Sequence, residues 1–142
     1  MIARHHNLLS RKIIYILLLF NFLEANAQAP IILMHGFIGW GRDEIRGYPY
    51  WGGGVDLEEY LTLKGFQVYT VSMGPISSNW DRAVEAFYQI KGGQVNYGAT
   101  HSSEFDILQK PNGKRYDGFY PEWDDNHPIH IISHSQGGQT AR

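Results

Sequence analysis

Three short apolar runs constrain this chain more than any other feature of its sequence. They occupy residues 31–34, 66–71 and 129–132, and each is rich in β-branched or aromatic residues and bounded by turn formers. Polar and apolar residues do not alternate strictly within them, which favours parallel strands covered on both faces. Helical patterns lie between the strands, so the sequence predicts an α/β fold with right-handed crossovers.

Two helices are predicted between these strands. The first covers residues 56–64 and ends before a glycine that suits a C-terminal cap. The second covers residues 80–91, with Ser78 or Asn79 as the N-cap, and ends before a pair of glycines. Residues 93–128 are predicted to form loops and short elements, because turn formers interrupt the periodicity while scattered aromatic side chains still need packing partners.

The first 27 residues are predicted to be a signal peptide. Basic residues, among them Arg4, precede an apolar stretch at residues 13–23, and the Ala-Asn-Ala sequence at residues 25–27 has the small-x-small pattern that signal peptidase recognises. The apolar stretch is short for a helix that spans a bilayer, so an uncleaved anchor is the less favoured alternative. We therefore expect residues 28–142 to be secreted, with no membrane span after cleavage.

The composition excludes several kinds of site. The chain has no cysteine, which excludes a thiol nucleophile and a cysteine-based zinc site. A formal net charge of −2 gives no indication of a nucleic-acid partner. With 43% hydrophobic and 18% charged residues, the chain has the composition of a globular domain, and its core must hold it together without disulfides.

The third apolar run leads directly into the sequence Ser-His-Ser-Gln-Gly-Gly at residues 133–138. This is a variant of the G-x-S-x-G nucleophile elbow of α/β-hydrolases, in which small residues on both sides of the serine allow a sharp strand-to-helix turn. Ser133 replaces the first glycine and is still small. The motif predicts Ser135 as the catalytic nucleophile. His134 is adjacent to it and is not expected to act as the base.

The first apolar run ends in a His-Gly-Phe sequence, where this fold places an oxyanion donor. We expect the backbone N–H groups of Phe37 and Gln136 to form the oxyanion hole, because Gly36 lets the chain turn toward the substrate. His35 is expected to hold this loop by hydrogen bonds. A plain strand-to-loop turn with a core histidine is the alternative.

Several longer blocks occur in a fixed order along the chain. They are PIILMHGFIGWGR at residues 30–42, YWGG at 50–53, GPISSNWDRA at 74–83, YGATH at 97–101 and HIISHSQGGQTAR at 130–142. In these blocks, which extend over most of residues 30–142, the chain resembles the secreted lipases of bacilli and staphylococci. The resemblance implies an α/β-hydrolase that cleaves carboxylic esters of lipids, typically triacylglycerols. It implies Ser135 as the nucleophile and Phe37 and Gln136 as the oxyanion donors.

The family that the chain resembles also carries a structural zinc ion bound by two aspartates and two histidines. Asp81 and His101 match two of these ligands, whereas Ile107 stands where the second histidine would fall. Glu104 or Asp106 could supply a carboxylate oxygen instead. Otherwise Asp81 caps its helix and His101 is an ordinary loop residue. No cofactor is required for the expected hydrolysis itself.

The catalytic triad of this fold follows the order serine, acid, histidine, and only seven residues follow Ser135. Residues 28–142 are therefore expected to be the N-terminal part of a lipase domain. This would be a partial α/β-hydrolase fold whose missing C-terminal half contains the acid and the base, so that residues 1–142 alone are inactive. Two alternatives stay open: a non-catalytic lipid- or ester-binding module, and a non-lipid esterase.

Overall fold

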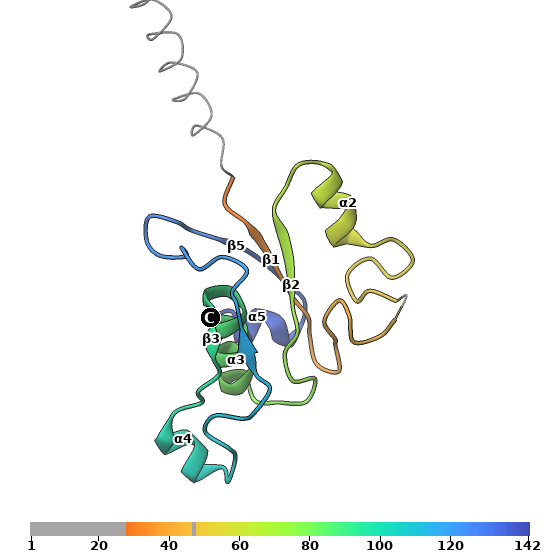
Figure 1. Ribbon diagram of the computed structural model, residues 1–142. Coiled ribbons are helices and arrows are strands. Elements are labelled where there is room, and N and C mark those ends of the chain that lie inside the picture. Colours follow the sequence, from red (N-terminus) through yellow and green to blue (C-terminus); the bar gives the residue numbers. More distant parts are fainter. Residues whose placement is uncertain (1–27, 47) are drawn as a thin grey trace, which may run out of the picture.

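A sheet of three parallel strands forms the centre of the molecule (Figure 1). The computed structural model describes residues 28–46 and 48–142, so the predicted signal peptide lies outside the described residues. The strands, in their spatial order, are β2 (Val68–Val71), β1 (Ile31–Met34) and β5 (His130–Ser133). The α/β class and the parallel pairing expected from the apolar runs are confirmed.

Helices and two short strands connect this sheet. They are α2 (Leu57–Leu63), α3 (Asn79–Lys91), β3 (Gly93–Gln94), α4 (Ala99–Glu104), β4 (Arg115–Tyr116) and α5 (Gln136–Thr140). The side chain of Asp56 caps α2 by accepting from the Glu59 N–H, and that of Ser78 caps α3 by accepting from the Asp81 N–H. Among the helices of the described residues, none has both the length and the apolar character needed to cross a bilayer.

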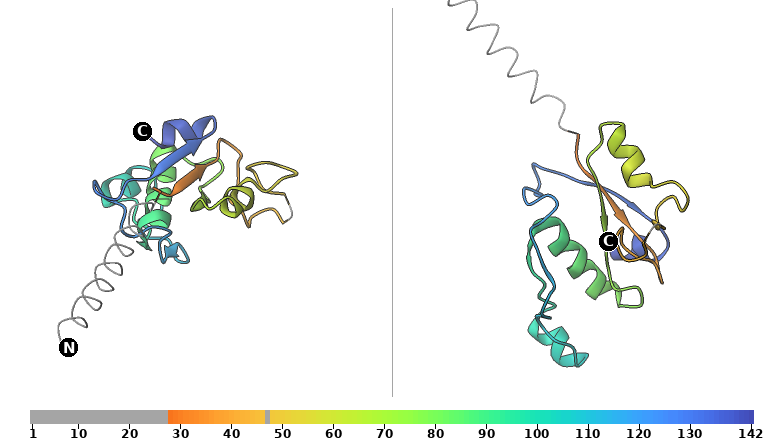
Figure 2. Two further views of the ribbon diagram at one scale, coloured as in Figure 1. Left: turned by 90° about the horizontal axis from the view of Figure 1, so that it is seen from above. Right: turned by 45° about the vertical axis from the view of Figure 1, so that its right-hand side comes forward.

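The main core lies between β1, β2 and α3. Ile32 and Met34 of β1 are buried against Ala86 and Ile90 of α3, which lie one helical turn apart on the same face. Figure 2 shows α3 on one side of the strands and α2 on the other. This packing fixes the end of β1, from which the chain continues into the candidate site.

Within the described residues, the sheet is not covered on both faces at β5. All four residues of this strand are exposed, and the side chains of Ile131 and Ile132, which point to opposite faces, are 38% and 43% exposed. Within residues 28–46 and 48–142, β1 is the only strand that pairs with β5, so β5 lies at the edge of the described part of the sheet. An edge strand with one neighbour buries less of each side chain than a central strand does.

A buried ion pair attaches the irregular segment after α3 to that helix. Glu85 is 2% exposed and accepts hydrogen bonds from Lys114 and, at 2.6 Å, from the hydroxyl of Tyr97. Burial and the neighbouring carboxylate raise the pKa of Tyr97 to about 12. Burial by itself lowers the pKa of Lys114, but the hydrogen bonds to Glu85 and Tyr97 outweigh it and raise the pKa above its usual value. Lys114 therefore remains charged and neutralises Glu85.

Candidate active site

Ser135 lies at the sharp turn between β5 and α5. Its backbone has φ 54° and ψ −123°, a conformation that non-glycine residues rarely adopt. The side chain is exposed, does not cap α5, and forms no hydrogen bond with the part of the chain that the structure describes. The turn therefore presents an unengaged serine hydroxyl to solvent, as the elbow motif predicts.

The small residues of the elbow are needed because α5 begins against the end of β1. A Cβ atom on Gly137 would lie 2.5 Å from the carbonyl oxygen of Met34 and 2.8 Å from that of His35. A Cβ atom on Gly138 would lie 3.5 Å from Oγ of Ser133, which is ordinary contact. Glycine is thus required at position 137, whereas serine at position 133 fits without a clash.

The loop after β1 approaches the elbow closely. A Cβ atom on Gly36 would lie 2.9 Å from Cβ of Ser135 and 3.0 Å from the carbonyl oxygen of His134, so only glycine permits this approach. Phe37 follows directly, and Gln136 is the first residue of α5, where an N–H has no partner within the helix. Among the described residues, neither the N–H of Phe37 nor that of Gln136 has an acceptor. The oxyanion hole formed by these two N–H groups stays a prediction, which their lack of an acceptor permits.

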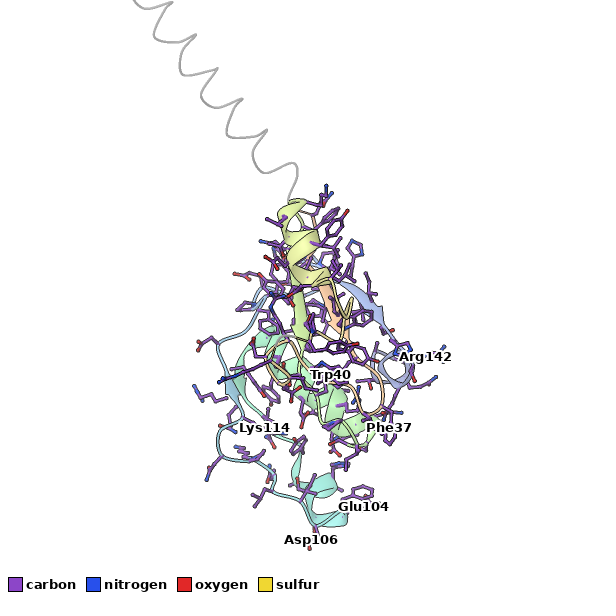
Figure 3. The ribbon with its side chains drawn as sticks, turned by 90° about the vertical axis from the view of Figure 1, so that its right-hand side faces the viewer. Phe37, Trp40, Glu104, Asp106, Lys114 and Arg142 are labelled. Carbon is purple, nitrogen blue, oxygen red and sulfur yellow. The ribbon has the colours of Figure 1, made fainter. Side chains whose placement is uncertain are left out.

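Apolar side chains border this turn. Phe37 and Ile38 are 57% and 62% exposed, and Figure 3 shows Phe37 and Trp40 on the segment that follows β1. Ile38 itself has a positive φ of 55° and donates its N–H to the carbonyl oxygen of Pro75 at 2.8 Å. This hydrogen bond ties the apolar loop to the segment after β2.

His35 holds the same loop from inside the protein. The side chain is fully buried, its Nδ1–H donates to the carbonyl oxygen of Gly36 at 2.9 Å, and its Nε2 accepts from the N–H of Met73 at 3.1 Å. Both nitrogens are used by the neutral ring, and burial lowers the pKa of His35 below its ordinary value. The expectation that His35 is a loop-holding residue is confirmed.

Acidification is expected to destabilise the protein through His35. Since its folded pKa lies below that of an unfolded histidine, about 6.5, the unfolded state binds more protons and the free energy of unfolding falls as the pH drops below about 6.5. Melting temperatures of the full-length gene product between pH 7.5 and pH 5.5 measure this. The His35→Asn variant should lose part of the pH dependence and the exposed-site control His130→Asn should retain it. If the melting temperature of His35→Asn depends on pH as strongly as that of wild type, another group causes the loss of stability in acid.

Arg82 of α3 forms hydrogen bonds with several segments around the elbow. The sequence patterns did not predict this role. Its guanidinium is fully buried and donates to the carbonyl oxygens of Gly74, at 2.8 Å, and His35, and to the hydroxyl of Thr140 at 3.2 Å. Burial lowers the pKa of Arg82. The hydroxyl of Thr140 in turn donates to the carbonyl oxygen of Gln136 at 3.1 Å. One side chain thereby links the end of β1 to α5.

Tyr50 is a second residue of this site that sequence reasoning missed. Its hydroxyl forms hydrogen bonds with the backbone N–H of Gly36 and with Nδ1 of His134. His134 thus points to Tyr50, in agreement with the expectation that it does not serve as the base. The only signal for Tyr50 in the sequence was its place in a block that resembles the lipases.

The two predicted zinc ligands lie in contact with each other. Nε2 of His101 is 2.8 Å from one carboxylate oxygen of Asp81, and the other oxygen accepts from the Ser78 hydroxyl at 2.7 Å. Asp81 lies in the first turn of α3 without being its cap, because Ser78 is the N-cap. The pair joins α4 to the start of α3.

The remaining donors of a zinc site are not brought to this pair. Ile107 lines the same cavity, of about 320 Å³, as Asp81 does, and it carries no donor atom. Glu104 and Asp106 are exposed at the outer end of the α4 segment (Figure 3). Across the described ranges, no group of three histidine, cysteine or acidic side chains could hold a metal. Within the described residues, Asp81 and His101 therefore supply two of the four donors that a closed zinc site needs, and the zinc ion stays a prediction.

A known protein family matches almost the whole of the described chain. The family model "Lipase-like, C-terminal domain" matches residues 27–142. The chain belongs to this family. The relatives of this lipase-like chain include the lipase of Staphylococcus hyicus, 41% identical over 115 residues that cover 80% of this chain and 18% of that protein. Lipase 1 of Staphylococcus aureus is 40% identical over 119 residues, which cover 81% of this chain and 17% of that protein.

The chain is also similar to solved structures of bacterial lipases and of EstA. EstA from Clostridium botulinum has 49% identity and a TM-score of 0.74, over 80% of the lipase-like chain and 26% of EstA. The crystal structure of the S. hyicus lipase has 40% identity and a TM-score of 0.75, over 80% of this chain and 30% of that one. The lipase-like chain thus spans less than a third of the length of these relatives.

Proposed function

We propose that this chain supplies the nucleophile and the oxyanion donors of a serine-dependent carboxylic ester hydrolase that acts on lipids. The observation that carries the proposal is the exposed hydroxyl of Ser135, held on a strained turn beside the free N–H groups of Phe37 and Gln136. A backbone strain of this kind costs on the order of 1–3 kcal/mol and is concentrated at functional sites. Its presence at an exposed serine favours a catalytic role.

In the proposed reaction, Oγ of Ser135 attacks the ester carbonyl carbon while its proton passes to a general base. The N–H groups of Phe37 and Gln136 stabilise the negative charge that develops on the carbonyl oxygen. When the tetrahedral intermediate collapses, the alcohol leaves with the proton from the base, and the acyl group stays on Ser135. Water then attacks the acyl-serine and releases the carboxylic acid.

The histidines on the two segments that meet at the elbow already have hydrogen-bond partners. Both ring nitrogens of His35 are used inside the protein, and Nδ1 of His134 is used by Tyr50. The chain spans 17–30% of the relatives described above. We therefore propose that the base and the acid of the triad come from outside residues 28–142.

The substrate assignment rests on two observations. Phe37 and Ile38 expose apolar side chains beside the nucleophile, which suits an ester with an apolar acyl chain. Relatives at 40–41% identity are named lipases. Together with the predicted signal peptide, these observations support an exported lipase over a non-lipid esterase. Comparing hydrolysis of a triacylglycerol emulsion with that of a water-soluble acetate ester tests this preference.

Covalent labelling tests the proposed nucleophile. A fluorophosphonate probe is expected to modify the full-length gene product once, at Ser135, because only an activated serine displaces fluoride from the probe. Peptide mass spectrometry locates the adduct. Ser135→Ala should abolish labelling, whereas the matched control Ser133→Ala, which removes a hydroxyl two residues away, should keep it. A wild-type protein that binds lipid but takes no label would instead favour a non-catalytic binding module.

A further inference from the structure

The hydroxyl of Tyr50 touches both chain segments that carry the proposed oxyanion donors. It accepts a hydrogen bond from the N–H of Gly36 at 3.1 Å. A tyrosine hydroxyl has one proton, and because it accepts from Gly36, that proton is available to donate to Nδ1 of His134. We assign the hydroxyl proton to this contact, so that Tyr50 donates to Nδ1 of His134 and the ring proton of His134 lies on Nε2.

These two contacts lie next to the groups that would bind the oxyanion. Gly36 directly precedes Phe37, and His134 lies two residues before Gln136. A single hydroxyl therefore bridges the loop after β1 and the elbow, at the place where Gly36 comes closest to Ser135. The distance between the two N–H donors depends on how these segments are held relative to each other.

The ring of Tyr50 is itself fixed by aromatic neighbours. It meets the rings of Trp40 and Trp51 edge-on, with centroid distances of 5.2 and 5.7 Å, and that of His35 at 5.7 Å. These three aromatic contacts favour one orientation of the ring. Its position is therefore set before a substrate arrives, which is what an oxyanion-binding site requires.

We propose that Tyr50 is a positioning residue that sets the geometry of the oxyanion hole through Gly36 and His134; this rests on the proposed function. Among the described residues, the hydroxyl forms no hydrogen bond with Ser135 or with the two donors, so it acts through the backbone segments that it joins. Losing it misplaces donors that act mainly on the charged intermediate. The expected consequence is a lower kcat with little change in KM.

The test compares Tyr50→Phe with Tyr48→Phe in the full-length gene product. Tyr50→Phe is expected to lower kcat for a p-nitrophenyl ester by about 10- to 100-fold and to change KM less than about twofold. The inhibition constant of a boronic acid that mimics the tetrahedral intermediate should rise by a similar factor. Tyr48→Phe removes an exposed hydroxyl two residues away and should behave as wild type, because the backbone carbonyl that accepts from Trp40 is retained.

A second variant keeps the test valid if Tyr50→Phe fails to fold. His134→Ala removes the other partner of the hydroxyl from an exposed position. If both residues act through one contact, the double variant should lose no more kcat than the worse single variant. Additive losses, or a Tyr50→Phe enzyme with unchanged kcat and unchanged boronate inhibition, would overturn the proposal.

One readout separates this proposal from the function on which it rests. The ¹⁵N shifts of the His134 ring report its tautomer without any catalysis. Tyr50→Phe should shift the His134 ring toward the tautomer populations of a free, solvent-exposed imidazole, and ¹⁵N shifts unchanged from wild type would overturn the positioning contact alone. If Ser135→Ala keeps full hydrolysis while the tautomer of His134 still responds to Tyr50→Phe, the proposed nucleophile is wrong and the contact stands.

Discussion

Replacing Ser135 with alanine is expected to lower kcat for ester hydrolysis by about 10⁵- to 10⁶-fold in the full-length gene product. The hydroxyl oxygen is the atom that would form the acyl intermediate, and the oxyanion donors that stay behind provide only residual catalysis by water. Initial rates on an emulsified triacylglycerol measure the loss. A variant with more than about one hundredth of the wild-type rate would contradict the assignment of Ser135 as nucleophile.

A glycine at position 135 separates the loss of the hydroxyl from the backbone strain at this turn. Ser135→Gly should lose activity as completely as Ser135→Ala does, but it should raise the melting temperature, because φ 54° and ψ −123° suit a residue without a Cβ atom. A gain in stability together with a loss of activity is typical of strain kept for function. If Ser135→Gly melts at a lower temperature than Ser135→Ala, the turn is not strained in the way described.

Replacing Arg82 with methionine is expected to cost about 3–5 kcal/mol of stability, because the carbonyl oxygens of His35 and Gly74 lose a buried donor and a charged side chain is lost from a packed site. Both carbonyls belong to segments that surround the elbow. The variant should therefore also react more slowly with the fluorophosphonate. Differential scanning calorimetry measures the first effect and the labelling rate measures the second.

Two further variants define the role of Arg82. Arg82→Lys keeps the charge but cannot reach three acceptors in one plane, so its melting temperature should lie between those of wild type and Arg82→Met. Arg115→Met, which replaces an exposed arginine on β4, should change the melting temperature little. Equal effects of Arg82→Met and Arg115→Met would mean that the buried hydrogen bonds contribute no net stability.

The sequence predicted the strands and the two longer helices closely. The first apolar run and β1 both cover residues 31–34, and β5 is shifted by one residue from the third run. The start of β2 is two residues later than expected, because the N–H of Phe66 still donates back to the carbonyl oxygen of Leu61 in α2. These elements depend on hydrophobic pattern and capping residues, which are properties of short stretches of chain.

The apolar pattern of residues 129–132 by itself predicts burial, whereas β5 is exposed among the described residues. An apolar run specifies that a strand can be buried, but which neighbours cover it depends on the rest of the fold. The ion pair of Glu85 with Lys114 was missed in the same way. Its partners lie 29 residues apart and meet only because the segment after α3 folds back on that helix.

What the sequence by itself determined is the elbow: a strand, a serine and glycines at the spacing that a sharp turn needs. The sharp turn requires small side chains at positions close to the serine in the sequence, so a short stretch of consecutive residues is enough to predict it. Tertiary structure alone decided which side chains support it. Tyr50 reaches His134 across 84 positions and Arg82 reaches Thr140 across 58, and such hydrogen bonds exist only after the strands and helices have packed.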